Sequence, residues 1–171
     1  SLDGIPIYNE KQQNKIFSNN DIGSIIVAIA NRNIRIQKIQ YFKKKGFQIA
    51  NAIHKDSYIS PSAKIGEGCH IKVGAIIDTN CVIGMGCIID NGVIVAHDCM
   101  IKNGSHLAPG VSLAGGVKIG ENTLIGVGSA VASKITIGAN VIVTTGVNID
   151  NNIPNNSLVG GPSMKITGKV R

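Results

Sequence analysis

Residues 82–117 read "VIGMGC IIDNGV IVAHDC MIKNGS HLAPGV SLAGGV", six successive units of six residues. The same period runs over residues 58–153, where the second position of all sixteen hexads is Ile, Val or Leu. The fifth position is Gly nine times and Asn four times, the residue types that best tolerate a left-handed backbone. Each hexad therefore predicts a short strand followed by a turn.

A single hexad is too short to bury its own apolar position. Three hexads that close a triangular coil point their second positions at a common axis, and stacked coils then form a parallel β-helix. At a strand spacing of about 4.8 Å, the repeat predicts a prism about 25 Å long. The cysteines all occupy the sixth hexad position, which predicts small core residues that stay reduced: Cys69, Cys81, Cys87 and Cys99.

The segment before the repeat has a different pattern. "SIIVAIA" (24–30) predicts a buried strand, and residues 34–45 predict a helix that Asn31 or Asn33 caps and Gly46 ends. Two further strands are predicted at 5–8 and 47–53, so that this segment forms a small βαβ cap. The predicted organisation is a cap over residues 1–57, a β-helix domain over 58–153 and a C-terminal tail over 154–171.

The composition narrows the range of partners. The net charge is +7, but aromatic residues make up only 4% of the chain and do not alternate with basic ones, so no nucleic-acid partner is expected. A basic surface instead attracts small phosphorylated ligands such as nucleotide sugars or coenzyme A. No apolar run approaches the roughly 18 residues of a membrane span, and the first residues lack a signal pattern. We therefore expect a cytoplasmic protein without a membrane partner.

One hexad, "IVAHDC" (94–99), departs from the turn chemistry of the others. His97 lies at the fourth position, at a corner and pointing outward, and Asp98 lies where Gly or Asn prevails. One interpretation is a surface histidine beside a permitted turn residue. The other is chemical, because a neutral imidazole with a pKa of about 6.5 suits a general base and an adjacent carboxylate fixes its tautomer. The pair alone is compatible with both.

Two longer stretches carry a family resemblance. "VAIANRNIRIQKIQYFKKKGFQIANAIHKDSYISPSAKIG" (27–66) and "VIVAHDCMIKNGSHLAPGVSLAGGVKIG" (93–120) resemble the left-handed β-helix acyltransferases. The similar branch is that of bacterial sugar acetyltransferases of the sialic acid O-acetyltransferase and UDP-4-amino-sugar N-acetyltransferase type. The resemblance implies a left-handed parallel β-helix after a Rossmann-like cap. That cap normally opens with a strand and a glycine-rich loop, which nothing before "LDGIPIYNE" matches, so we expect a partial cap.

The resemblance also implies roles for individual residues. His97 is implied as the general base and Asp98 as the residue that orients it. The backbone N–H of Gly115, which also makes a turn, is implied to meet the thioester oxygen. The implied acetyl-coenzyme A contacts are His106, Gly115, Val127, Thr145 and Lys165, and the implied substrate contacts are Asn9, Glu10, Asn31, Asp90 and Asn91. Most of these also have an ordinary interpretation as corner or surface residues.

The activity implied is direct transfer of acetyl from acetyl-coenzyme A to the amino group of a UDP-linked 4-amino-deoxy-sugar for surface glycans. The implied assembly is a homotrimer with its sites between subunits. O-acetylation of sialic acid or another sugar is the alternative within this class. A zinc enzyme is a second class, but His97 and His106 are nine residues apart without a close third histidine, so no metal is expected. A non-catalytic scaffold is the third.

Overall fold

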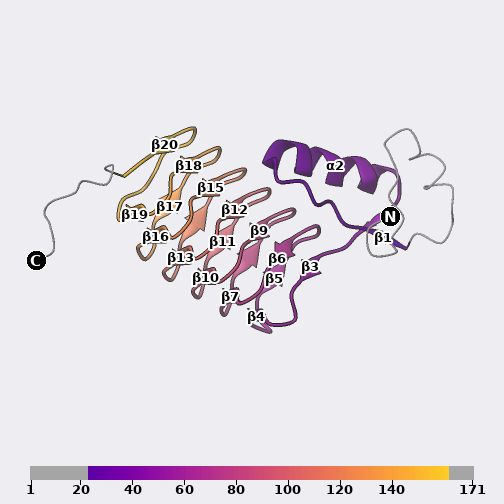
Figure 1. Cartoon of the computed structure of the whole chain (residues 1–171), viewed down its shortest axis with the longest axis horizontal. Coiled ribbons are helices and arrows are strands. Elements are labelled where there is room, and N and C mark those ends of the chain that lie inside the picture. Colours follow the sequence, from indigo (N-terminus) through magenta and orange to yellow (C-terminus); the bar gives the residue numbers. More distant parts are fainter. Residues whose placement is uncertain (1–22, 162–171) are drawn as a thin grey trace, which may run out of the picture.

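The computed structural model describes residues 23–161. From residue 52 onward the chain forms a prism of two-residue strands joined by turns, and the helix α2 (Arg32–Lys44) lies along one edge of it (Figure 1). Each strand pairs in parallel with strands one coil away, so that three sheets form three faces. The predicted left-handed β-helix of hexapeptide repeats is confirmed. No helix within residues 23–161 is long and apolar enough to cross a membrane.

The chain visits the three faces in turn. Face 1 contains β4 (Tyr58–Ile59), β7 (Ile76–Ile77), β10 (Ile94–Val95), β13 (Ser112–Leu113), β16 (Ala130–Val131) and β19 (Asn148–Ile149). Face 2 contains β5 (Lys64–Ile65), β8 (Val82–Ile83), β11 (Met100–Ile101), β14 (Lys118–Ile119) and β17 (Thr136–Ile137). Face 3 contains β3 (Ala52–Ile53), β6 (His70–Ile71), β9 (Ile88–Ile89), β12 (His106–Leu107), β15 (Leu124–Ile125), β18 (Ile142–Val143) and β20 (Leu158–Val159).

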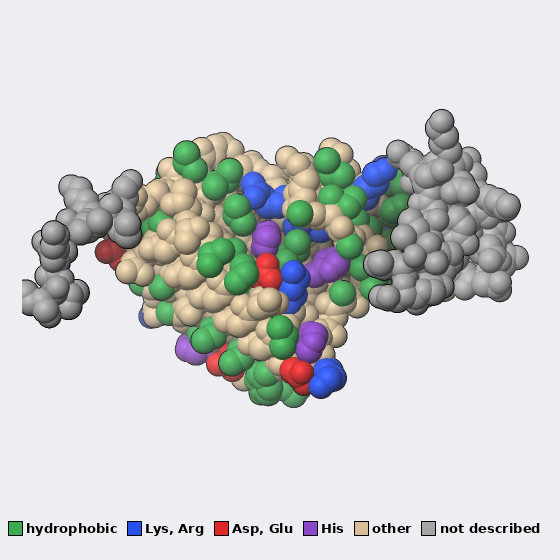
Figure 2. Space-filling view, viewed as in Figure 1, with side chains coloured by type: hydrophobic (Ala, Val, Ile, Leu, Met, Phe, Trp, Pro, Cys, Tyr) green, Lys and Arg blue, Asp and Glu red, His purple; other side chains and the backbone are tan. Residues whose placement is uncertain are grey.

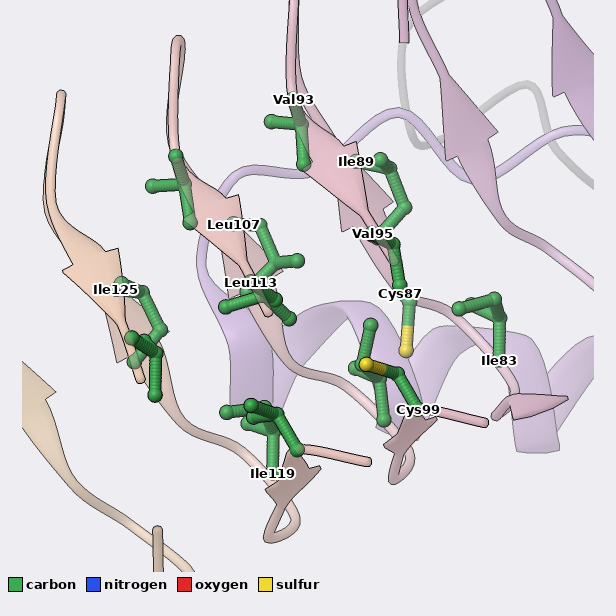
Figure 3. Packing of buried hydrophobic residues seen from close by; sticks show 14 of the residues in the cluster. Ile83, Cys87, Ile89, Val93, Val95, Cys99, Leu107, Leu113, Ile119 and Ile125 are labelled. Carbon is green, nitrogen blue, oxygen red and sulfur yellow. The ribbon is translucent and has the colours of Figure 1, made fainter. Parts of the chain in front are cut away.

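The hydrophobic core follows the axis of the prism. Side chains at the second and sixth hexad positions are buried along most of its length, because both positions point inward, toward the axis. All four cysteines are buried and free, which confirms the prediction made for them. Figure 3 shows Cys87 and Cys99 pointing into this core among Ile89, Leu113 and Ile119.

The corners between faces depend on one backbone conformation. From Gly68 to Gly146, the fifth position of every hexad has a positive φ, as Gly92 (64°) and Gly116 (72°) show. Six residues other than glycine adopt it within the described chain: Asn80, Asp98, Asn122, Lys134, Asn140 and Asn156. Asp98, with a φ of 59°, therefore takes the left-handed position that the repeat predicted for it.

The cap is a βαβ unit in which β1 (Ser24–Ile25) pairs in parallel with β2 (Gln48–Ile49). The helix begins at Arg32 rather than at residue 34, because the side chain of Asn31 accepts a hydrogen bond from the Ile34 N–H and so caps it. Gly46 follows the end of the helix with a φ of 87°, as predicted.

The strand predicted over residues 24–30 is wrong beyond Ile25. The carbonyl oxygens of this segment have side-chain partners instead of a neighbouring strand. His70 Nε2 is 2.9 Å from the carbonyl oxygen of Val27, and Arg35, which is fully buried, donates from Nη1 to those of Ile29 and Ala30. Arg35 also donates to Gly86 and Gly104 in the prism, so that a single residue joins the cap to two coils.

The sheet of face 3 extends beyond residues 58–153 at both ends. At the first end β3 pairs with β6, and Ile53 fits the second position of one more hexad, 52–57. At the other end the last coil is two residues shorter than the rest, since Ile137 bridges to Ile153 and Ile142 pairs with Leu158. The 18-residue spacing of the other pairs thus becomes 16 residues in this coil.

Candidate active site

The predicted His-Asp pair lies at the corner between face 1 and face 2, in the turn that follows β10. His97 Nδ1 is 2.8 Å from Asp98 Oδ2, and both side chains are more than half exposed. Consecutive side chains diverge on a straight strand, whereas the left-handed backbone at Asp98 turns its carboxylate toward the imidazole. The corner conformation is therefore what allows two neighbouring residues to form a hydrogen bond.

The carboxylate of Asp98 has two partners. Hydrogen bonds with His97 and with Asn80, whose Nδ2 donates to Oδ1 at 3.2 Å, lower the pKa of Asp98. The group is therefore ionised at neutral pH and acts as an acceptor. In the neutral imidazole, the proton then lies on Nδ1, and Nε2 keeps its lone pair for a proton from elsewhere.

Gly115 lies one coil above His97 at the same corner. A Cβ on Gly115 would lie 2.6 Å from both Cε1 and Nε2 of His97, so the imidazole packs directly over the glycine backbone. The next residue, Gly116, donates its N–H to the carbonyl oxygen of His97 at 2.9 Å. The N–H of Gly115 has no hydrogen-bond partner within residues 23–161. The corner thus combines a proton acceptor with an available donor.

A second polar cluster lies on face 3, at its corner with face 1. Asp90 Oδ2 is 3.3 Å from His106 Nε2, and Asp90 Oδ1 is 3.3 Å from Lys72 Nζ and accepts the N–H of Asn91. Figure 2 shows acidic, basic and histidine side chains gathered on one surface of the prism. Lys72 was missed by sequence reasoning, although it stands 18 residues, or one coil, before Asp90.

The charges in this cluster depend on burial and on one another. Burial alone raises the pKa of Asp90, but the hydrogen bonds from Asn91, His106 and Lys72 outweigh it, and the net pKa is lowered. Burial lowers the pKa of His106, against the opposing effect of Asp90. At neutral pH the cluster therefore holds an ionised Asp90 beside an uncharged His106.

The other predicted residues are distributed around the prism. Val127 and Thr145 are exposed and follow β15 and β18, which places them at the same corner as Asp90 and Asn91. Within one subunit, face 1 separates that corner from His97. The Oδ1 of Asn31 is engaged in the helix cap, while Asn9, Glu10 and Lys165 lie outside the described residues. No three His, Cys, Asp or Glu side chains in residues 23–161 could together hold a metal ion.

Comparisons with known proteins agree with this architecture. Residues 80–115 match the family of bacterial transferase hexapeptide (six repeats), and residues 116–151 match the family of the hexapeptide repeat of succinyl-transferase. A comparison with curated proteins found no match.

Several solved structures are similar over nearly the whole chain. The acetyltransferase domain of PglB from Neisseria gonorrhoeae FA1090, in complex with acetyl coenzyme A, is 31% identical with a TM-score of 0.87 and covers 94% of this chain and 78% of its own. PerB from Caulobacter crescentus, in complex with CoA and GDP-perosamine, is 33% identical with a TM-score of 0.90 and covers 98% and 81%. A variant of perosamine N-acetyltransferase from the same organism is 33% identical with a TM-score of 0.89 and covers 97% and 79%. The chain belongs to the hexapeptide-repeat sugar acetyltransferases.

Proposed function

We propose that this chain transfers the acetyl group of acetyl-coenzyme A to the 4-amino group of a nucleotide-linked deoxy-sugar used for surface glycans. The observation that carries the proposal is the His97–Asp98 pair with its imidazole packed over Gly115. The similar structures support the substrate class, since one contains acetyl coenzyme A and another contains CoA with GDP-perosamine. The sequence resemblance favours a UDP-linked sugar, while the likeness to PerB favours a GDP-linked one.

In the proposed reaction, His97 acts as the general base. Its Nε2 takes a proton from the sugar amine as the nitrogen attacks the thioester carbonyl, and Asp98 stabilises the imidazolium that results. The N–H of Gly115 donates to the carbonyl oxygen as negative charge develops there. His97 then returns the proton to the departing thiolate, so that the products are an amide and coenzyme A. The cysteines point inward, which favours direct transfer without an acyl-enzyme.

The second polar cluster and its corner are proposed as ligand contacts. We assign the sugar end to Asp90 and Asn91, and the acetyl and pantetheine portions to His106, Val127 and Thr145. The cap, with Asn9, Glu10 and Asn31, is proposed to hold the nucleotide, and Lys165 a coenzyme phosphate. We also propose that the reaction takes place in the cytoplasm, where acetyl-coenzyme A and nucleotide-linked sugars are present.

Assembly as a homotrimer would bring the two separated corners together. Exposed aliphatic side chains lie on both prism faces that meet at the His97 corner: Ile76 and Ile94 on face 1, and Val82 and Met100 on face 2. Packing of a second subunit against them would cover apolar surface and supply the wall that a single convex corner lacks. Light scattering at micromolar concentration tests this proposal. A monomer with full acetyl transfer would refute it and leave the fold unaffected.

The activity is tested by following thiol release from acetyl-coenzyme A with a panel of UDP- and GDP-linked amino sugars and sialic acids. We expect release with a 4-amino-sugar nucleotide and a product heavier by one acetyl group in mass spectrometry. The control is His97→Ala, in which kcat falls by about 10² or more while the affinity for acetyl-coenzyme A stays within a few-fold. Normal turnover in that variant would refute the role of His97 as general base. Acetylation of sialic acid and of no amino sugar would refute the 4-amino-sugar substrate.

A further inference from the structure

A ladder of inward-facing donors connects successive coils of the prism. At the sixth hexad position, a thiol or hydroxyl donates to the carbonyl oxygen of the residue 15 positions later, at the corner one coil above. The donors and acceptors are Cys69 and Gly84, Cys81 and Ala96, Cys87 and Lys102, Cys99 and Ala114, Ser105 and Gly120, Thr123 and Gly138, and Ser129 and Thr144. The same device thus recurs with three different residue types.

Two of these bonds end at the candidate catalytic corner. Cys81 Sγ is 3.1 Å from the carbonyl oxygen of Ala96, the residue before His97. Cys99 Sγ is 3.2 Å from the carbonyl oxygen of Ala114, the residue before Gly115. The other bonds end at the remaining two corners of the prism.

Because of peptide geometry, each hydrogen bond to a carbonyl oxygen also fixes the direction of the N–H of the next residue. A peptide unit is planar and trans, so its C=O and N–H point in opposite directions and rotate together. When Cys99 holds the Ala114 carbonyl toward the core, the N–H of Gly115 is directed outward, toward the side on which His97 lies. In the same way, Cys81 fixes the peptide plane from which the His97 side chain departs.

We propose that Cys81 and Cys99 are positioning residues for acetyl transfer, Cys81 acting through His97 and Cys99 acting through the N–H of Gly115. The inference rests on the proposed function of this corner. Both sulfurs remain protonated donors at neutral pH, because burial raises the pKa of Cys99 to about 11 and also raises the pKa of Cys81. Both side chains are buried, which leaves them out of reach of the substrate.

The chain supplies its own matched controls. Cys69→Ala and Cys87→Ala remove the same sulfur and the same kind of bond from neighbouring coils, but at the corner between face 2 and face 3. We expect Cys81→Ala and Cys99→Ala to lower kcat about three- to tenfold, the size of one ordinary hydrogen bond, while KM for acetyl-coenzyme A changes less than twofold. The two control variants should keep the wild-type kcat with a similar loss of thermal stability.

Serine provides the rescue, since Ser105 and Ser129 already make this bond elsewhere in the prism. Cys81→Ser and Cys99→Ser should therefore return kcat to within about twofold of wild type. Equal losses of kcat in all four alanine variants, or serine variants as slow as alanine, would show that the thiols only fill the core and would overturn the proposal.

A measurement without substrate separates this inference from the proposed activity. The Cε1–H resonance of His97, identified by its absence in His97→Ala, is recorded by NMR at fixed pH in each variant. We expect it to shift in Cys81→Ala, to return in Cys81→Ser and to stay in place in Cys87→Ala. An unchanged resonance in Cys81→Ala would refute the positioning of His97, whatever the enzyme acetylates.

Discussion

Replacing Gly115 with alanine tests the candidate site at its closest contact. The new Cβ would lie 2.6 Å from Cε1 and Nε2 of His97, and ordinary contact begins at 3.4 Å, so the ring must retreat by about 0.8 Å. Gly115 does not have a positive φ, and the imidazole is free to move into solvent. We therefore expect little change in stability but a loss of kcat of about 10²-fold, the usual effect of misplacing a catalytic group by about 1 Å.

The assay compares Gly115→Ala with Gly116→Ala, using thiol release for kcat and thermal unfolding for stability. At Gly116 the φ of 72° strains an alanine, but the nearest neighbour of the new Cβ is Lys134 Cγ at 3.4 Å, and the Cβ does not approach His97. Gly116→Ala should lose about 1 kcal/mol of stability and keep most of its turnover. A Gly115→Ala variant with wild-type kcat would refute the placement of the reaction at Nε2 of His97.

Three further predictions concern the polar residues. Asp98→Gly should keep or raise the melting temperature, because glycine suits the φ of 59° at this position. The same change should lower kcat about tenfold or more, because His97 loses its hydrogen-bond partner; an unchanged kcat would make Asp98 a turn residue only. Because the pKa of Asp90 is lowered in the folded protein, its contribution to stability is present above about pH 4 and is lost as the pH falls through the lowered value. Melting temperatures of wild type and Asp90→Asn should therefore differ at pH 6 and converge in acid. A difference that stays constant with pH would contradict this. Arg35→Met should destabilise the protein by about 3 kcal/mol or more in denaturant unfolding, since four carbonyl oxygens lose a charged donor, and an unchanged midpoint would count against the cap attachment described above.

The hexads made the prism predictable because a six-residue period fixes which face every side chain belongs to. The buried cysteines and the left-handed backbone of Asp98 follow from position alone, and both are found in the structure. The approach of Lys72 to Asp90 also follows from the 18-residue coil, but it becomes visible only when the sequence is read in coils instead of hexads.

Features outside the lattice could not be predicted in this way. The strand ends at Ile25 because side chains of His70 and Arg35 bond to carbonyl oxygens that it would use. An arginine in a helix gives no local signal that it reaches backward and across to two coils. The shortened last coil likewise depends on how residues near Asn152 bond, since its side chain accepts the Thr136 N–H. The close contact of the His97 ring with Gly115 also could not be predicted, because it depends on the distance between neighbouring coils, which the sequence pattern does not give.

Because the coils stack at a constant spacing, the position of a residue along the prism axis follows from the number of coils that precede it. The turn with His97 follows β10, the third strand of face 1, so it stands two strand spacings, or about 10 Å, from the level of β4, the first strand of that face. Removing 18 residues between β4 and β10 would shorten that separation by about 4.8 Å and leave every side chain on its own face. Removing a single hexad would instead carry His97 to a different corner. The number of coils before β10 therefore determines how far the reacting nitrogen stands from the first coil, and the number of hexads determines which corner it occupies.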